Sequence, residues 1–83
     1  MSQATMHRLH LSISRNRFEK LLGGEWETDK DNRNLRRNGK WETFTGPSRV
    51  LQGRRDKFVR NLRSGATRSG RSWRELAEAL KLV

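Results

Sequence analysis

The sequence predicts a small α+β domain, in which an antiparallel sheet of two or three strands packs with a basic helix and short flanking helices. Alternating polar and apolar residues before residue 14 and between residues 25 and 45 are typical of half-buried strands. Asn38-Gly39 indicates a tight hairpin turn, and apolar residues at helical spacing follow Pro47 and Ser72. We expect a single domain over residues 1–83, because a chain of this length holds one thin core.

The N-terminal part is predicted to contain a strand and a short helix. Apolar residues alternate with polar ones over residues 7–13, as in a strand with one buried face. Ser14 is a suitable N-cap for a helix that buries Phe18 and Leu21-Leu22. Gly23-Gly24 should end this helix, since glycine tolerates a positive φ angle.

A hairpin is the clearest local feature. A strand should begin near Glu25, and residues 30–34 are polar turn material. Asn38-Gly39 predicts a type I′ turn, because that turn needs two residues at positive φ. The predicted strands are residues 33–37 and 40–45, in a register that pairs Arg37 with Lys40, Arg36 with Trp41 and Leu35 with Glu42. The Arg36 guanidinium could then lie across the Trp41 ring, so both residues are candidates for stacking or for support of a binding site.

A basic helix is predicted to begin at Pro47 or Ser48 and to end at Arg63. Gly53 weakens its interior by about 1 kcal/mol relative to alanine, so the helix could also begin after that residue. Its expected inward residues are Val50, Leu51, Phe58, Val59 and Leu62.

The remaining residues are predicted to form a linker and a last helix. Residues 64–71 are rich in glycine, serine and arginine, which indicates a flexible basic linker. Ser72 and Glu75 have the spacing of a capping box. The helix that they open should bury Trp73 on an apolar face that continues to Val83.

Positive charge is concentrated in the basic region, residues 46–74. This region holds eight arginines and one lysine against a single acid, Asp56, and so supplies +8 of the net charge of +10. Arginine outnumbers lysine 14 to 5 in the whole chain, and its planar guanidinium suits phosphates and base edges. The clustering therefore points to a polyanionic partner. The expected nucleic-acid contacts are Arg49, Arg54, Arg55, Lys57, Arg60, Arg63, Arg68 and Arg71.

From these features we expect a small nucleic-acid-binding protein, such as a regulator from a phage or mobile element. DNA and RNA are both open as partners, and so is a homodimer. Trp26 and Trp41 could belong to the core or stack on unpaired bases. The alternative is a protein–protein inhibitor or adaptor that covers an acidic surface of a host enzyme or nucleoprotein complex.

Enzymatic and metal-dependent functions find little support. His7 and His10 would point to opposite faces of a strand, which makes them a poor metal pair and a poor acid–base couple. Residues 29–34 resemble the start of a calcium loop but lack its glycine and its final acid. The chain has no cysteine, so a disulfide or a thiolate metal site is excluded. We expect no cofactor, no membrane span, no export signal at Met1–Thr5, and a location in the cytoplasm or nucleoid.

Overall fold

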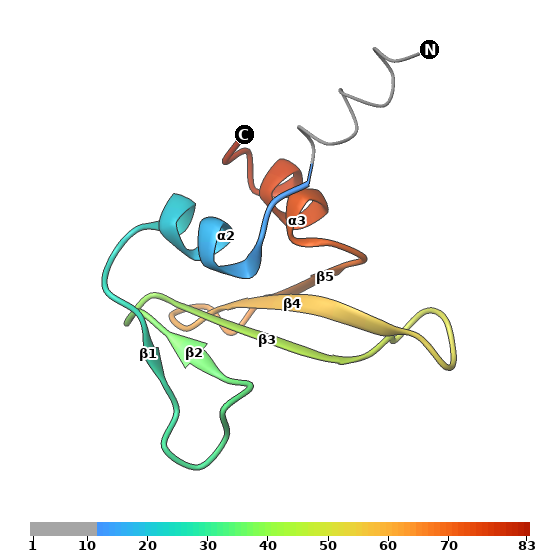
Figure 1. The fold of residues 1–83 in the computed structure, drawn as a ribbon, viewed down its shortest axis with the longest axis horizontal. Coiled ribbons are helices and arrows are strands. Elements are labelled where there is room, and N and C mark those ends of the chain that lie inside the picture. The colour runs from blue at the N-terminus through green and yellow to red at the C-terminus, as the bar shows by residue number, and fades with distance from the viewer. Residues whose placement is uncertain (1–11) are drawn as a thin grey trace.

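The computed structural model describes residues 12–83, which form a five-stranded antiparallel sheet with two helices over one face (Figure 1). The expected α+β class is confirmed, although the sheet is larger than the two or three strands predicted. The strands lie in the sheet in chain order, so each pairs with its neighbour in sequence. The elements are α2 (Arg15–Leu22), β1 (Glu27–Thr28), β2 (Arg36–Arg37), β3 (Trp41–Pro47), β4 (Arg55–Asn61), β5 (Thr67–Gly70) and α3 (Trp73–Ala79).

The predicted strand over residues 7–13 lies outside the described residues except for Ser12 and Ile13, which belong to no strand. Within residues 12–83, neither helix has the length and apolar composition needed to cross a membrane.

The first helix begins and ends where local signals place it. Ser14 is its N-cap, and the Ser14 hydroxyl accepts a hydrogen bond from the backbone N–H of Arg17 at 3.1 Å. Gly23 is its C-cap at φ 87°, and the Gly23 N–H donates to the carbonyls of Glu19 and Lys20. A residue with a side chain would be strained at that φ, which explains why the helix ends at glycine.

The last helix also begins at its predicted cap. The Ser72 hydroxyl accepts a hydrogen bond from the Glu75 N–H at 3.1 Å. The Glu75 carboxylate in turn accepts from the Arg71 N–H at 2.7 Å, so the cap satisfies one further donor before the helix. The helix ends at Ala79, earlier than the predicted Val83.

The predicted register of the Asn38-Gly39 hairpin is wrong by two residues. Arg37 pairs with Glu42 and Arg36 with Thr43, and the Asn38 N–H donates to the Trp41 carbonyl at 3.0 Å, so the chain reverses at Gly39 and Lys40 instead of at Asn38 and Gly39. The side chain of Asn38 causes this difference, because its Oδ1 accepts hydrogen bonds from the N–H groups of Lys40 and Trp41. These bonds stabilise a turn that is centred one residue later than the expected type I′ turn.

The predicted basic helix over residues 47–63 is also wrong, since residues 48–54 form a loop and Arg55–Asn61 form strand β4. All seven residues of β4 pair with the seven of β3, so bonds to a neighbouring strand replace helical ones. Phe58 and Val59 are both buried, but adjacent strand residues point to opposite faces of a sheet. Val59 enters the core beneath the helices, and Phe58 lies on the other face against Phe44.

The predicted flexible linker over residues 64–71 is also wrong, because residues 67–70 form the edge strand β5 and pair with residues 57–60 of β4. The turn before this strand is held by Asn61. Its Oδ1 accepts from the N–H groups of Arg63 and Ser64, and its backbone N–H donates to Ala66. Glycine and serine here make a hairpin turn and a short edge strand rather than a linker.

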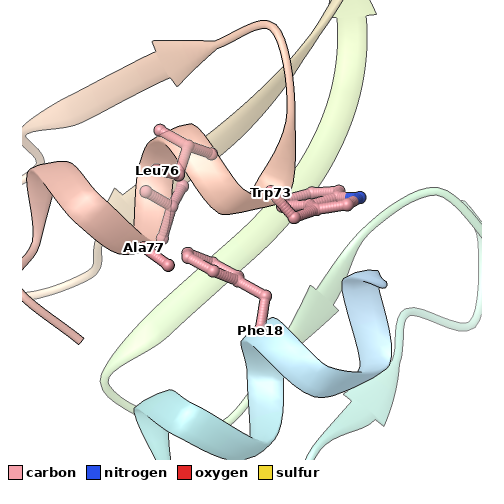
Figure 2. Packing of buried hydrophobic residues seen from close by; sticks show 5 residues of the cluster. Phe18, Trp73, Leu76 and Ala77 are labelled. Carbon is pink, nitrogen blue, oxygen red and sulfur yellow. The ribbon is translucent and has the colours of Figure 1, made fainter. Parts of the chain in front are cut away.

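The core lies between the helices and the sheet. Phe18, Trp73, Leu76 and Ala77 meet there with Val59 of β4, and Figure 2 shows Phe18 reaching from α2 toward the residues of α3. The centroids of the Phe18 and Trp73 rings are 5.3 Å apart. Trp73 is only 7% exposed, so its predicted place on the apolar face of the last helix is confirmed.

A buried carboxylate joins the first helix to the sheet. Glu19 of α2 is 2% exposed and accepts hydrogen bonds from three side chains. Arg36 Nε donates to both of its oxygens at 2.9 and 3.0 Å, and the Thr43 hydroxyl donates at 2.9 Å. Arg15 Nε donates at 3.3 Å, and burial lowers the pKa of this guanidinium. One side chain thus ties α2 to β2 and β3.

Replacing Trp73 by alanine should lower the free energy of unfolding by about 3 kcal/mol or more, because the indole fills the centre of a thin core. Thermal and denaturant unfolding of the full chain would measure the loss. Val83→Ala is the matched control, since Val83 is largely exposed. Equal stability of the two variants would contradict the role of Trp73 in the core.

Candidate nucleic-acid interface

The basic side chains fall into two groups, those that pair with an acid and those that do not. All nine acids of the chain lie within the described residues. Ion pairs within residues 12–83 involve six arginines, which are Arg15, Arg36, Arg37, Arg54, Arg60 and Arg74. The other twelve arginines and lysines of that range form no ion pair with an acidic side chain, so their charge is available to a polyanion.

The sheet face opposite the helices is close to electrically balanced. Glu42 is buried there between Arg37 and Arg60, at 3.0 and 3.3 Å. Arg37 also pairs with Asp29 at 2.8 Å, and this hydrogen bond from Arg37 holds the pKa of Asp29 below its usual value. These arginines already form ion pairs with acids, so this part of the sheet is a weak candidate for phosphate binding.

Two stacked phenylalanines occupy the middle of the same face. The rings of Phe44 and Phe58 are 5.0 Å apart and nearly parallel. The Arg60 guanidinium lies 5.4 Å from the Phe44 centroid, and that of Arg49 lies 5.6 Å from the Phe58 centroid. Arg60 is further held by Glu42, whereas Arg49 has no acidic partner in the described residues. Arg49 can therefore reach a ligand without breaking an ion pair.

Four unpaired cations lie in or beside the far end of the β3–β4 hairpin, and we call Arg49, Arg55, Lys57 and Arg71 the distal basic cluster. Arg49 lies over Phe58, on the face opposite to Arg55 and Lys57. Arg55 and Lys57 alternate with the core residue Val59, so they lie on the helix side of the sheet. The hairpin projects past the helices at this end (Figure 1). Arg55 donates to the Thr45 hydroxyl at 3.1 Å, and Arg71 directly follows Gly70, the partner of Lys57.

Residues 48–54, the tip loop, connect the two strands of this hairpin in a tightly bonded turn. The Ser48 hydroxyl accepts from the N–H groups of Val50 and Leu51 at 3.1 and 2.9 Å. Arg54 donates through Nε and Nη2 to the two oxygens of Asp56, at 2.9 and 3.2 Å. This hydrogen bonding from Arg54 lowers the pKa of Asp56. Arg54 therefore supports the loop, and Asp56 is neutralised by it.

A second basic site surrounds Trp41 at the other end of β4. Trp41 packs against the core and lines two hollows of about 160 and 510 Å³. Both hollows lack acidic lining residues. Arg68 borders the smaller hollow, and Lys40 and Arg63 border the larger one. We call Lys40, Trp41, Arg63 and Arg68 the tryptophan site.

The predicted contact of Arg36 with Trp41 is wrong. Arg36 faces Thr43 and donates to Glu19, so it does not lie across the indole ring. Trp26 is also engaged elsewhere, because its Nε1 donates to the carbonyls of Glu19 and Gly23 at 2.9 and 3.0 Å. Trp41, in contrast, has basic neighbours around two hollows.

The structure distributes the eight predicted contact residues over three environments. Arg49, Arg55, Lys57 and Arg71 form the distal basic cluster, Arg63 and Arg68 belong to the tryptophan site, and Arg54 and Arg60 are held in ion pairs. Sequence reasoning missed Lys40 as a site residue. The position of Lys40 in a predicted hairpin turn, next to Trp41, was the sequence feature that indicated it.

No protein-family model, curated protein or solved structure matches the chain. Within residues 12–83, no three His, Cys, Asp or Glu side chains are grouped so that they could hold a metal ion. His7 and His10 lie outside that range.

Asp56 should contribute stability that depends on pH. Its pKa in the folded chain lies below the ordinary value of 3.8, so its contribution to stability is present above that pH and is lost as pH falls through the folded value. We expect Asp56→Asn to flatten the loss of melting temperature between about pH 5 and pH 2 relative to the unmodified chain. Glu78→Gln is the control, because Glu78 is exposed. Parallel profiles for Asp56→Asn and the unmodified chain would contradict the proposed pairing.

Proposed function

We propose that the chain binds nucleic acid, and that cations without acidic partners at both ends of β4 contact its phosphates. One observation carries this proposal. Five of the nine acids, Glu19, Asp29, Glu42, Asp56 and Glu78, form ion pairs with other arginines, whereas no acid forms an ion pair with the distal basic cluster and none lines the hollows of the tryptophan site. Such separation of unpaired positive charge is what a polyanion requires.

The spacing of the two sites suits a phosphate backbone. β4 runs from Arg55 to Asn61, which corresponds to about 20 Å at the rise of a strand. Duplex DNA presents one charge per about 1.7 Å of its axis, so several phosphates fit between the two sites. The sheet would hold the cations at fixed spacing, in place of the helix and linker expected from the sequence. Trp41 is the residue that we propose for a stacking contact.

We expect affinity for duplex DNA to fall steeply with salt. If roughly four to six phosphates are neutralised, the slope of log K against log salt should be about −4 to −5. Fluorescence anisotropy of a labelled duplex, titrated with the full chain at several salt concentrations, measures this slope, and a structured RNA is titrated in parallel. Absence of binding to both at about 100 mM salt would refute the proposal and favour an acidic protein surface as partner.

The double variant Arg55→Ala/Lys57→Ala should weaken binding and make the salt slope shallower by about one to two units, since two phosphate contacts are removed. The control Lys20→Ala/Lys30→Ala removes the same charge from exposed positions outside both sites. A role for net charge alone predicts equal losses in the two double variants. A larger loss in the first would locate binding at the distal basic cluster.

A further inference from the structure

The tip loop presents two apolar side chains to solvent. Val50 is 83% exposed and Leu51 is 53% exposed, although the chain has few large apolar residues with which to build its core. Neither side chain belongs to the core cluster. Folding alone therefore gives no reason for two adjacent aliphatic residues at the end of a projecting hairpin (Figure 1).

The loop holds these side chains in a defined arrangement. The Ser48 hydroxyl caps the N–H groups of both residues, and the Ser48 N–H donates to the Arg54 carbonyl at 2.7 Å. The two hydrogen bonds from Arg54 to Asp56 fix the base of the loop. Little conformational freedom remains to be lost when the tip meets a partner, so the loop is suited to insertion.

The charges around the tip indicate the kind of partner. Arg49 immediately precedes Val50, and Arg55 begins the strand that follows the loop. Neither arginine has an acidic partner within residues 12–83, and the nearby acid Asp56 is neutralised by Arg54. An apolar tip between free cations matches a surface that is anionic outside and apolar inside. The base stack between two phosphate backbones is such a surface.

We propose that Val50 and Leu51 insert between adjacent base pairs from the minor groove of duplex DNA and kink the duplex, while Arg49 and Arg55 contact the flanking phosphates. Aliphatic wedges of this size are suited to opening a base step, and the bend brings more phosphate within reach of the protein. Flexible pyrimidine–purine steps should be preferred, because they unstack most easily. This inference rests on the proposed function and adds the form of DNA and the mode of contact.

The test uses the full chain and a duplex of about 20 base pairs, with a fluorophore at each end and 2-aminopurine at a central TA step. Binding should bring the ends closer, seen as increased energy transfer, and should raise the 2-aminopurine signal. Val50→Ser/Leu51→Ser should abolish both changes and lower affinity by about tenfold, with an unchanged salt slope. Val83→Ser, at a 53% exposed position outside the loop and outside both basic sites, should retain both signals.

Four outcomes distinguish insertion into DNA from the alternatives. Loss of the bend in the double variant alone, at an unchanged melting temperature, supports insertion. Binding without a bend in the unmodified chain overturns the wedge but leaves the proposed function intact, whereas no binding to DNA overturns both. Binding to vesicles of phosphatidylglycerol and phosphatidylcholine that needs Val50 and Leu51, with duplex binding unaffected by the substitutions, would assign the tip to membranes instead.

Discussion

The arrangement of the helices on the sheet depends on the buried carboxylate of Glu19. It receives hydrogen bonds from Arg15 of its own helix, from Arg36 of β2 and from Thr43 of β3. Arg15 also connects this hydrogen-bonded network to α3, because its guanidinium lies 5.6 Å from the centroid of the Trp73 ring. Removing one partner from such a buried pair typically costs about 3–5 kcal/mol, which is large for a domain with so few core residues. The apolar contacts between α2 and α3 therefore lie beside these buried hydrogen bonds, which hold α2 on the sheet.

Arginine has two different uses in this fold. One set fills ion pairs with the acids, and these pairs order the sheet and the tip loop. The other set remains unpaired at the two ends of β4. Adjacent residues can differ completely in this respect, since Arg54 is bound to Asp56 while Arg55 makes only a hydrogen bond to a hydroxyl. The number of arginines in a segment therefore says less about binding than the position of the acids does.

The sheet relates the proposed contacts to one another. The distal basic cluster and the tip loop share the projecting end of the β3–β4 hairpin, and the tryptophan site lies at the other end of β4 (Figure 1). A strand pair of seven residues on each side keeps these sites apart at a fixed distance. We therefore expect the protein to meet nucleic acid along β4, with the tip at one limit of the contact and Trp41 at the other.

The sequence alone determined the features that depend on neighbouring residues. Ser14, Gly23 and Ser72 mark helix ends because their bonds or φ angles are local, and the concentration of charge in residues 46–74 is independent of fold. Only the tertiary structure decided that residues 55–61 form a strand. The apolar spacing of Phe58, Val59 and Leu62 fits a helix, and the choice was made by a partner strand that satisfies the backbone of β4. The same long-range pairing brought Arg60 to Glu42 across neighbouring strands and Arg36 of the sheet to Glu19 of the helix layer.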